Sequence, residues 1–107
     1  MTTFNEALLR STEALFRAAF AGNVAAARLA LDEGASIDAL DNATGLRPLH
    51  IAIGRNHLEL TKLLLERGAT VGPDRQDRWP STIAELCEVD AELCDLVADA
   101  EMKLDAV

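Results

Sequence analysis

Two histidines and two cysteines are the side chains of this sequence best suited to acid–base or nucleophilic chemistry. Cys87 and Cys94 lie seven positions apart without a Cys-x-x-Cys pair or a neighbouring His-x-x-x-His, which does not favour a zinc site. His50 has no serine, cysteine or aspartate in an obvious sequence relation to it, as a general base would need. We therefore interpret His50 and His57 as structural residues and both cysteines as buried free thiols that pack as small apolar groups. The one catalytic alternative is a site assembled from separated residues, with Cys87 near a histidine.

The sequence contains no other motif that would indicate catalysis. A nucleophile elbow, a phosphate-binding glycine loop, a His-Glu-x-x-His helix and a paired-carboxylate spacing are all absent. The six glycines fall at expected turns and helix ends, where backbone geometry accounts for them. We expect a protein that is not an enzyme and that has no cofactor and no bound metal.

The segments that would carry these residues repeat along the chain with a period of 34 positions. Shifting the sequence by that distance superposes leucine, alanine and glycine pairs: Leu15 on Leu49, Ala18 on Ala52, Gly34 on Gly68 and Ala35 on Ala69. A third, degenerate copy begins near Arg75, where the opening residues Trp79 to Ala84 need a slip of one position to align. The sequence thus consists of two clear repeats and one divergent repeat.

Apolar residues at helical spacing predict helices in every repeat. The first segment, up to about residue 21, is either one long helix or a short cap helix that runs into the first helix of a repeat. Further helices are expected over residues 24–33, 58–67, 81–87 and 91–103, together with one that opens at Pro48. Gly22 and Asn56 are expected to take left-handed turn positions within the repeats.

The stretch Gly45-Leu46-Arg47-Pro48-Leu49-His50-Ile51-Ala52, followed by Gly68-Ala69, resembles an ankyrin repeat. The resemblance implies an all-α solenoid of antiparallel helix pairs, with finger loops between the pairs and helical caps at both ends. It divides a single domain, residues 1–107, into a cap helix at 1–11, repeats at 12–40 and 41–74, and a divergent third repeat with a carboxyl-terminal cap at 75–107. In the family, the signature histidine bonds to a threonine three places before it. Here that place holds Arg47 instead of a hydroxyl.

The net charge of −8 disfavours a nucleic-acid partner, because binding a phosphate backbone needs clustered lysine and arginine. Residues 75–107 hold nine acidic and three basic side chains, which form either the solvated outer face of the last repeat or a surface that attracts a basic protein. No Lys or Arg precedes Arg10 and charges interrupt the apolar stretches, so we expect neither a signal peptide nor a membrane span, and a cytoplasmic location. Eight arginines against two lysines, with abundant alanine, favour a bacterial origin.

The resemblance also implies that partners are bound on a concave face, formed by the finger tips and the exposed side of the first helix of each repeat. Carried over by position, the partner-binding residues are Phe20, Ala21, Asn42, Thr44, Leu46, Arg55, Arg75, Asp77, Arg78 and Trp79. Trp79 has an alternative placement, folded back over the last repeat, and Leu46 has one under its own finger.

The family implies a non-catalytic module that binds and regulates, or stabilises, a cytoplasmic partner protein. Small size and acidity motivate a narrower alternative, an immunity or antitoxin-like inhibitor of a basic toxin domain. A third interpretation is a structural homo-oligomer subunit, so that both a monomer and a weak homodimer are open at this point.

Overall fold

The computed structural model describes residues 4–41, 44–73 and 76–105, and the side chains among them from residue 10 to residue 103. Six helices account for most of these residues: α1 (Phe4–Ala21), α2 (Val24–Asp32), α3 (Pro48–Gly54), α4 (Leu58–Glu66), α5 (Pro80–Leu86) and α6 (Ala91–Asp105). No strand occurs in the described ranges. The predicted all-α fold is confirmed.

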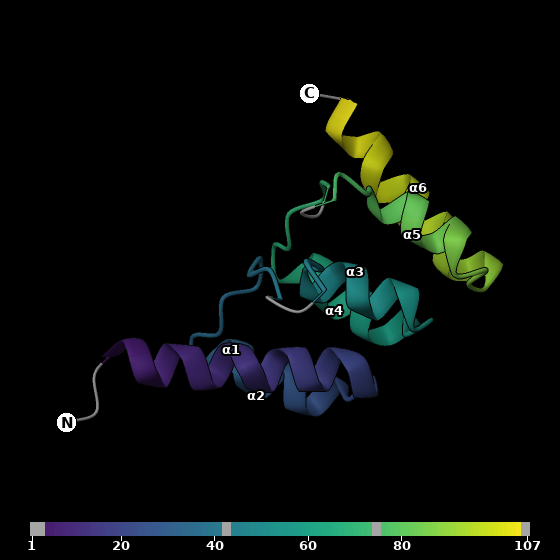
Figure 1. The fold of residues 1–107 in the computed structure, drawn as a ribbon. Helices are drawn as coiled ribbons and strands as arrows, with labels where there is room; N and C mark the ends of the chain where they lie inside the picture. Colours follow the sequence, from purple (N-terminus) through teal and green to yellow (C-terminus); the bar gives the residue numbers. More distant parts are fainter. Residues whose placement is uncertain (1–3, 42–43, 74–75, 106–107) are drawn as a thin grey trace.

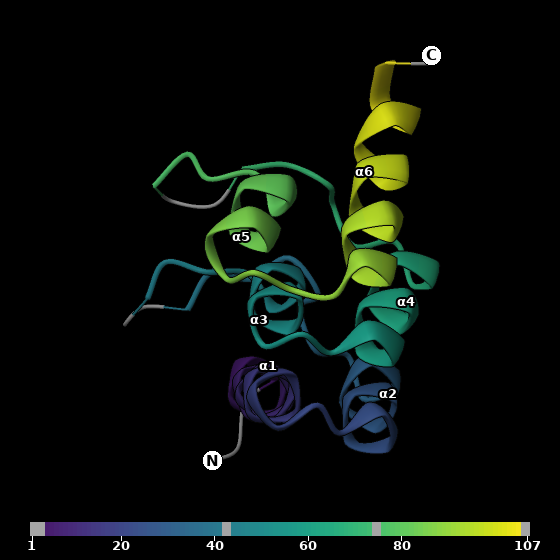
Figure 2. The ribbon, with the colours of Figure 1, turned by 90° about the vertical axis from the view of Figure 1, so that its right-hand side faces the viewer.

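The helices form three antiparallel pairs that stack along one direction (Figure 1). α3 packs between α1 and α5 in one layer, and α4 packs on α2 in the other. Seen along the helices, the connections from α2 to α3 and from α4 to α5 both project to the same side, beyond the layer of α1, α3 and α5 (Figure 2). The stack measures 46 × 27 × 24 Å and carries its loops on one flank.

Prolines and left-handed residues mark the ends of the helices. Pro48 and Pro80 occupy the first turns of α3 and α5, where the amide that proline lacks would have no helical partner. Within each pair the chain reverses at a residue with positive φ, which is 74° at Gly22, 61° at Asn56 and 51° at Glu88. The expected left-handed turns at Gly22 and Asn56 are confirmed, whereas Glu88 holds a conformation that a side chain with a Cβ disfavours.

Helix α1 is continuous over its 18 residues. Of the two expected arrangements, one long helix or a cap helix followed by a repeat helix, the structure shows one long helix. The cap helix expected at residues 1–11 is therefore not a separate element but the first part of α1. No glycine or proline lies between Phe4 and Ala21 to interrupt the helical hydrogen bonds. The repeat boundaries at residues 12, 41 and 75 stay predictions.

The core follows the seams between the pairs and is built from small and branched aliphatic side chains. Fully buried members come from both layers: Leu15, Ala19, Ala27, Leu49, Ala52, Ile53, Leu60, Leu64 and Leu93. Small residues allow close approach, and a Cβ added at Gly54 of α3 would lie 3.3 Å from Cγ2 of Ile83 of α5. Leu29 of α2 is 59% exposed, and Ala27 and Ala30 are the buried residues of that helix.

Polar contacts between consecutive pairs reinforce the stack on the loop side. The Asp38 carboxylate accepts hydrogen bonds from the Thr70 amide at 2.8 Å and from the Thr70 hydroxyl at 2.6 Å. Arg67, at the end of α4, forms an ion pair with Asp32 at the end of α2. Each of these contacts joins residues about one repeat apart, so the pairs are fixed at their ends as well as at their apolar seams.

Candidate functional site

Both histidines bind backbone carbonyls of a neighbouring helix pair. The His50 side chain is fully buried on α3, and its Nε2 lies 2.9 Å from the carbonyl oxygen of Arg78, just before α5. His57 Nε2 lies 3.2 Å from the carbonyl oxygen of Phe20, near the end of α1. These two rings connect the central pair to the pairs on either side, which is a structural role.

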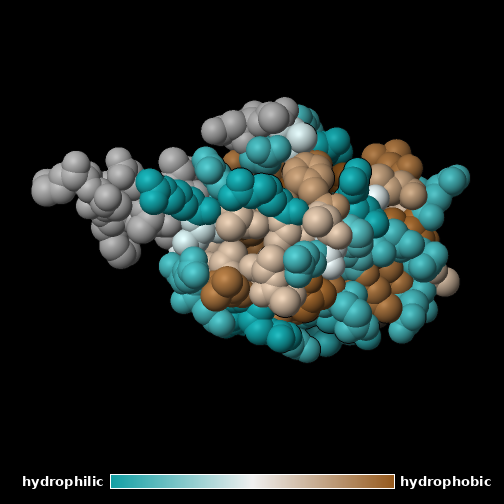
Figure 3. Space-filling view, turned by 90° about the horizontal axis from the view of Figure 1, so that it is seen from below, coloured by the Kyte–Doolittle hydropathy of each residue, from teal (hydrophilic) through white to brown (hydrophobic). Residues whose placement is uncertain are grey.

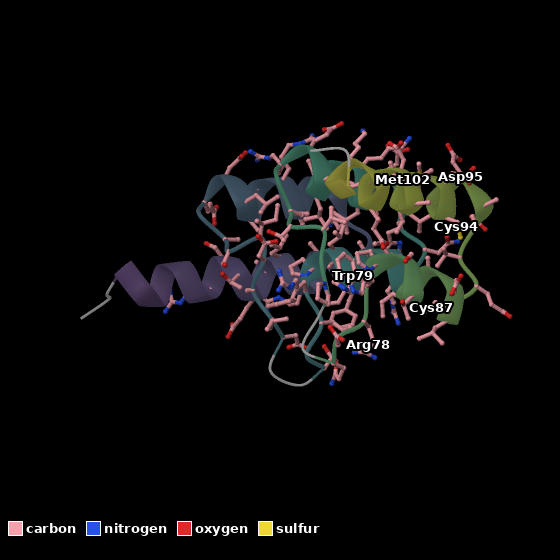
Figure 4. The ribbon with its side chains drawn as sticks, turned by 90° about the horizontal axis from the view of Figure 1, so that it is seen from above. Arg78, Trp79, Cys87, Cys94, Asp95 and Met102 are labelled. Carbon is pink, nitrogen blue, oxygen red and sulfur yellow. The ribbon has the colours of Figure 1, made fainter. Side chains whose placement is uncertain are left out.

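The cysteines are free thiols, but the expectation that both are buried is wrong. Cys87 is exposed at the carboxyl-terminal cap position of α5, and Cys94 is half-buried in the first turn of α6. Both lie at the end of the stack where α5 turns into α6 (Figure 4). Across the described part of the chain, no group of three His, Cys, Asp or Glu side chains is arranged to hold a metal ion.

An open groove of about 450 Å³ runs across α1, α3 and α5 on the loop side of the molecule. Its apolar lining comes from all three helices and from the first loop: Phe20, Leu46, Ile51, Ile83 and Leu86. Gly54 of α3 lies in the lining of the groove. It leaves the groove open because it has no side chain to fill the space between α1 and α5. Phe20 is 38% exposed and Leu86 is 69% exposed, so apolar surface faces solvent on both flanks of the groove.

The polar part of the lining is cationic or neutral. Arg55, at the end of α3, holds its guanidinium carbon 5.7 Å from the centroid of the Phe20 ring, a cation–π distance. Arg78 reaches in from the second loop and donates a hydrogen bond to Gln76 Oε1 at 2.5 Å. None of the described lining residues carries a carboxylate, although the whole chain has a net charge of −8.

A comparison with protein families agrees with this architecture. A family model described as ankyrin repeats (many copies) matches residues 15–65, from the second half of α1 almost to the end of α4. This chain is an ankyrin repeat protein. Ankyrin repeats generally mediate protein–protein interaction. No curated protein matches the sequence.

In this ankyrin repeat protein, four residues of the expected partner-binding face line the groove together: Phe20, Leu46, Arg55 and Arg78. Leu46 is half-buried and packs against the core, as its alternative placement allowed. Ala21, Asp77 and Trp79 are exposed but do not line the groove, with Trp79 39% exposed at the amino-terminal cap of α5. Figure 4 shows Arg78 and Trp79 at the opposite end of α5 from Cys87.

The remaining expected residues do not contribute to the groove. Thr44 serves its own loop, since its hydroxyl donates to Asp41 Oδ2 at 2.8 Å and accepts from the Leu46 amide at 3.2 Å. Asn42 and Arg75 lie outside the described residues.

Sequence reasoning missed the contribution of α5 to the ankyrin groove. Leu86 and Cys87 line it, and both follow Gly54 and Arg55 by 32 positions. The slip of one position in the divergent repeat would bring these residues into register. The signal was therefore in the sequence, but the family signature does not extend to α5.

A second hollow, of about 460 Å³, lies between α4 and α6 on the other layer. Its rim carries both signs of charge, and the Lys103 ammonium already pairs with Asp99 at 3.2 Å. Lys62 is likewise 3.7 Å from Glu59 on its own helix. None of the described residues that line this hollow is aromatic, so the groove across α1, α3 and α5 is the stronger candidate site.

Proposed function

We propose that this ankyrin repeat protein is a non-catalytic module that binds a cytoplasmic partner protein in the groove and thereby regulates or stabilises it. The observation that carries the proposal is the apolar lining left open to solvent in the groove, with an aromatic ring and a guanidinium at one flank. Concave, exposed apolar surface of this kind marks interaction sites, and aromatic and arginine side chains dominate interface energetics.

The scaffold under the groove supports the same conclusion. His50 and His57 hold α1, α3 and the start of α5 in fixed relation, and the floor residues Ile51 and Ile83 are buried. A preorganised surface loses little conformational freedom on binding, which favours affinity. The imidazole of His50, which lines the groove, is fully buried and its Nε2 is bonded to the Arg78 carbonyl, which supports a binding role without turnover.

A specific observation favours each of two other functions. Exposed acids on α6, among them Glu92, Asp95 and Asp99, favour an inhibitor that attracts a basic domain. Apolar atoms gather in the middle of the face formed by α1 and α2, the amino-terminal end of the stack (Figure 3). Exposed Ala25 and Leu29 on α2 favour a homodimer that covers apolar surface on these helices.

Affinity capture from the native host, quantified by mass spectrometry, tests the proposal. The groove variant is Phe20→Ala combined with Leu86→Ala, and the control is Met102→Ala, which removes an exposed apolar side chain of α6 outside the groove. Loss of two groove contacts should lower partner capture by about tenfold or more, since each tenfold corresponds to about 1.4 kcal/mol. Equal capture by the groove variant and the wild type would show that the groove is not the binding site.

Light scattering separates the homodimer from the other functions. A strict monomer at high concentration excludes self-assembly, whereas a dimer that Leu29→Glu dissociates would place the interface at α2. Capture of a basic partner that depends on α6 acids, and not on Phe20, would favour the inhibitor.

A further inference from the structure

We infer that the groove receives an acidic segment of its partner, a short stretch whose apolar side chains are flanked by aspartate or glutamate. The inference rests on the proposed function, because it requires the groove to bind protein. It concerns the chemistry of the occupant, and for the groove it reverses the preference for basic partners that the net charge alone would predict.

The first argument is the contrast between the charge of the groove and the charge of the whole molecule. The chain carries 18 acidic and 10 basic residues, yet the described lining of the groove holds two arginines and no carboxylate. Five of the nine acids of residues 75–107 lie on α6, among them the exposed Asp95 (Figure 4). Asp77, Glu85 and Glu88 neighbour lining residues in the sequence but are not themselves part of the lining. The groove is therefore apolar and cationic although the whole protein is acidic. The net charge alone does not reveal this local difference.

The second argument is the position of Arg55. Its guanidinium lies against the Phe20 ring, and the side chain is exposed and makes no ion pair with any described residue. A cation–π contact uses none of the N–H donors of arginine, so a carboxylate is still able to accept two of them at once. Phe20 thus holds the cation at the flank of the groove and offers apolar contact beside it.

The third argument is the free-energy cost of binding a basic segment in the groove. A lysine-rich or arginine-rich segment in the groove would place like charges beside Arg55 and Arg78 while removing all of them from water. The apolar part of the lining disfavours a fully charged segment as well, because the exposed side chains of Phe20 and Leu86 would then face polar groups. The occupant that satisfies both conditions alternates apolar and acidic side chains.

A phage-displayed library of random peptides, selected on the full-length protein at low ionic strength, tests this inference. Selected peptides should be enriched in Asp and Glu next to apolar residues. Individual peptides should bind Arg55→Glu about tenfold or more weakly than the wild type, because an attractive charge pair becomes a repulsive one. The matched control is Arg17→Glu, which makes the same charge change at an exposed position of α1 outside the groove, and it should alter affinity by less than about twofold.

The possible results separate the inference from the function on which it rests. Basic or neutral peptides that lose binding with Phe20→Ala would show that the groove binds protein segments and that the occupant is not acidic. Selection that yields no peptide dependent on Phe20 or Arg55 would overturn both the inference and the proposed function. Exchanging the charges on both sides gives the sharpest support. Peptides in which Glu is replaced by Lys should bind the Arg55→Glu variant better than they bind the wild type. Circular dichroism of each variant checks that Arg55→Glu, a surface change, leaves the fold intact.

Discussion

Asn56 and Asp90 exchange two hydrogen bonds across the boundary between the central and the last helix pair. The Asn56 side-chain amide donates to Asp90 Oδ2 at 3.1 Å, and the Asp90 backbone amide donates to Asn56 Oδ1 at 3.0 Å. The two residues are 34 positions apart, which equals the repeat period. Asn56 also supplies the left-handed turn between α3 and α4, so one side chain both reverses the chain and joins two repeats.

Replacing Asn56 should separate these two contributions. Asn56→Gly keeps the positive φ and removes both hydrogen bonds, and we expect it to lower the free energy of unfolding by about 1 kcal/mol. Asn56→Ala also removes both bonds and keeps a Cβ in the left-handed region without the local hydrogen bonding that lets asparagine adopt it, so it should cost about 1 kcal/mol more. Urea denaturation followed by circular dichroism gives both values. If Asn56→Gly is as stable as the wild type, the contact with Asp90 contributes nothing.

Glu88 occupies the corresponding turn of the last pair at a φ of 51°, with an exposed side chain. Because a residue with a Cβ is strained there, Glu88→Gly should raise the free energy of unfolding by up to about 1 kcal/mol. Glu85→Gly makes the same chemical change at an exposed position inside α5, where glycine should instead lower stability by about 1 kcal/mol. In thermal melts, the melting temperature should rise for Glu88→Gly and fall for Glu85→Gly. A decrease for both variants would show that the turn at Glu88 is not strained.

Gly22 should tolerate no side chain, for a reason beyond its positive φ. A Cβ at this position would lie 2.6 Å from Nδ1 and Cε1 of His57, whose ring is held by the Phe20 carbonyl. Gly68 also has a positive φ, 88°, but a Cβ there would meet nothing within 4 Å. We expect Gly68→Ala to cost about 1 kcal/mol from backbone strain alone, and Gly22→Ala to cost at least about 2 kcal/mol more, as overpacking does. Equal losses in urea denaturation would mean that His57 moves freely.

Arg47 is the residue whose replacement should stabilise the protein most directly. It caps the amino terminus of α3 without a side-chain hydrogen bond, and its buried Nε has no hydrogen-bond partner among the described residues. Threonine at this position would supply a hydroxyl to the free amides of the first turn, which is worth about 1 kcal/mol. Arg47→Thr should therefore raise the melting temperature above that of Arg47→Ala, which removes the same guanidinium but adds no cap. The same temperature for both would exclude a capping contribution.

The helices could be predicted from the sequence because their signals are local. Pro48 and Gly22 act through the backbone of their own turns, and the 34-residue period is visible without any knowledge of contacts. Expected helix ends agree with the structure to within one or two residues, as for the helix expected at 58–67 and found at Leu58–Glu66. The continuity of α1 could not be predicted, because no residue between Phe4 and Ala21 distinguishes a junction from an uninterrupted helix.

The candidate site could be predicted only in part because it is made of distant contacts. The repeat register predicts that Phe20 and Arg55 share one face, and both line the groove, but their cation–π contact joins residues 35 positions apart. The bond from His50 to the Arg78 carbonyl joins residues 28 positions apart, and no local pattern encodes it. The exposure of Cys87 depends on where α5 ends, and that end lies in the repeat with the weakest signature.

The groove is shared by α1, α3 and α5, and this has a consequence for how the molecule opens. α3 and α4 have a neighbour on each side, whereas the outer pairs have one, so fraying should begin at the two ends and amide exchange should be slowest in the middle. A partner segment that lies in the groove from Phe20 to Leu86 contacts both outer helix pairs. Such a segment would stabilise both outer helix pairs at once. Slower amide hydrogen exchange in both outer pairs would therefore indicate that it is bound.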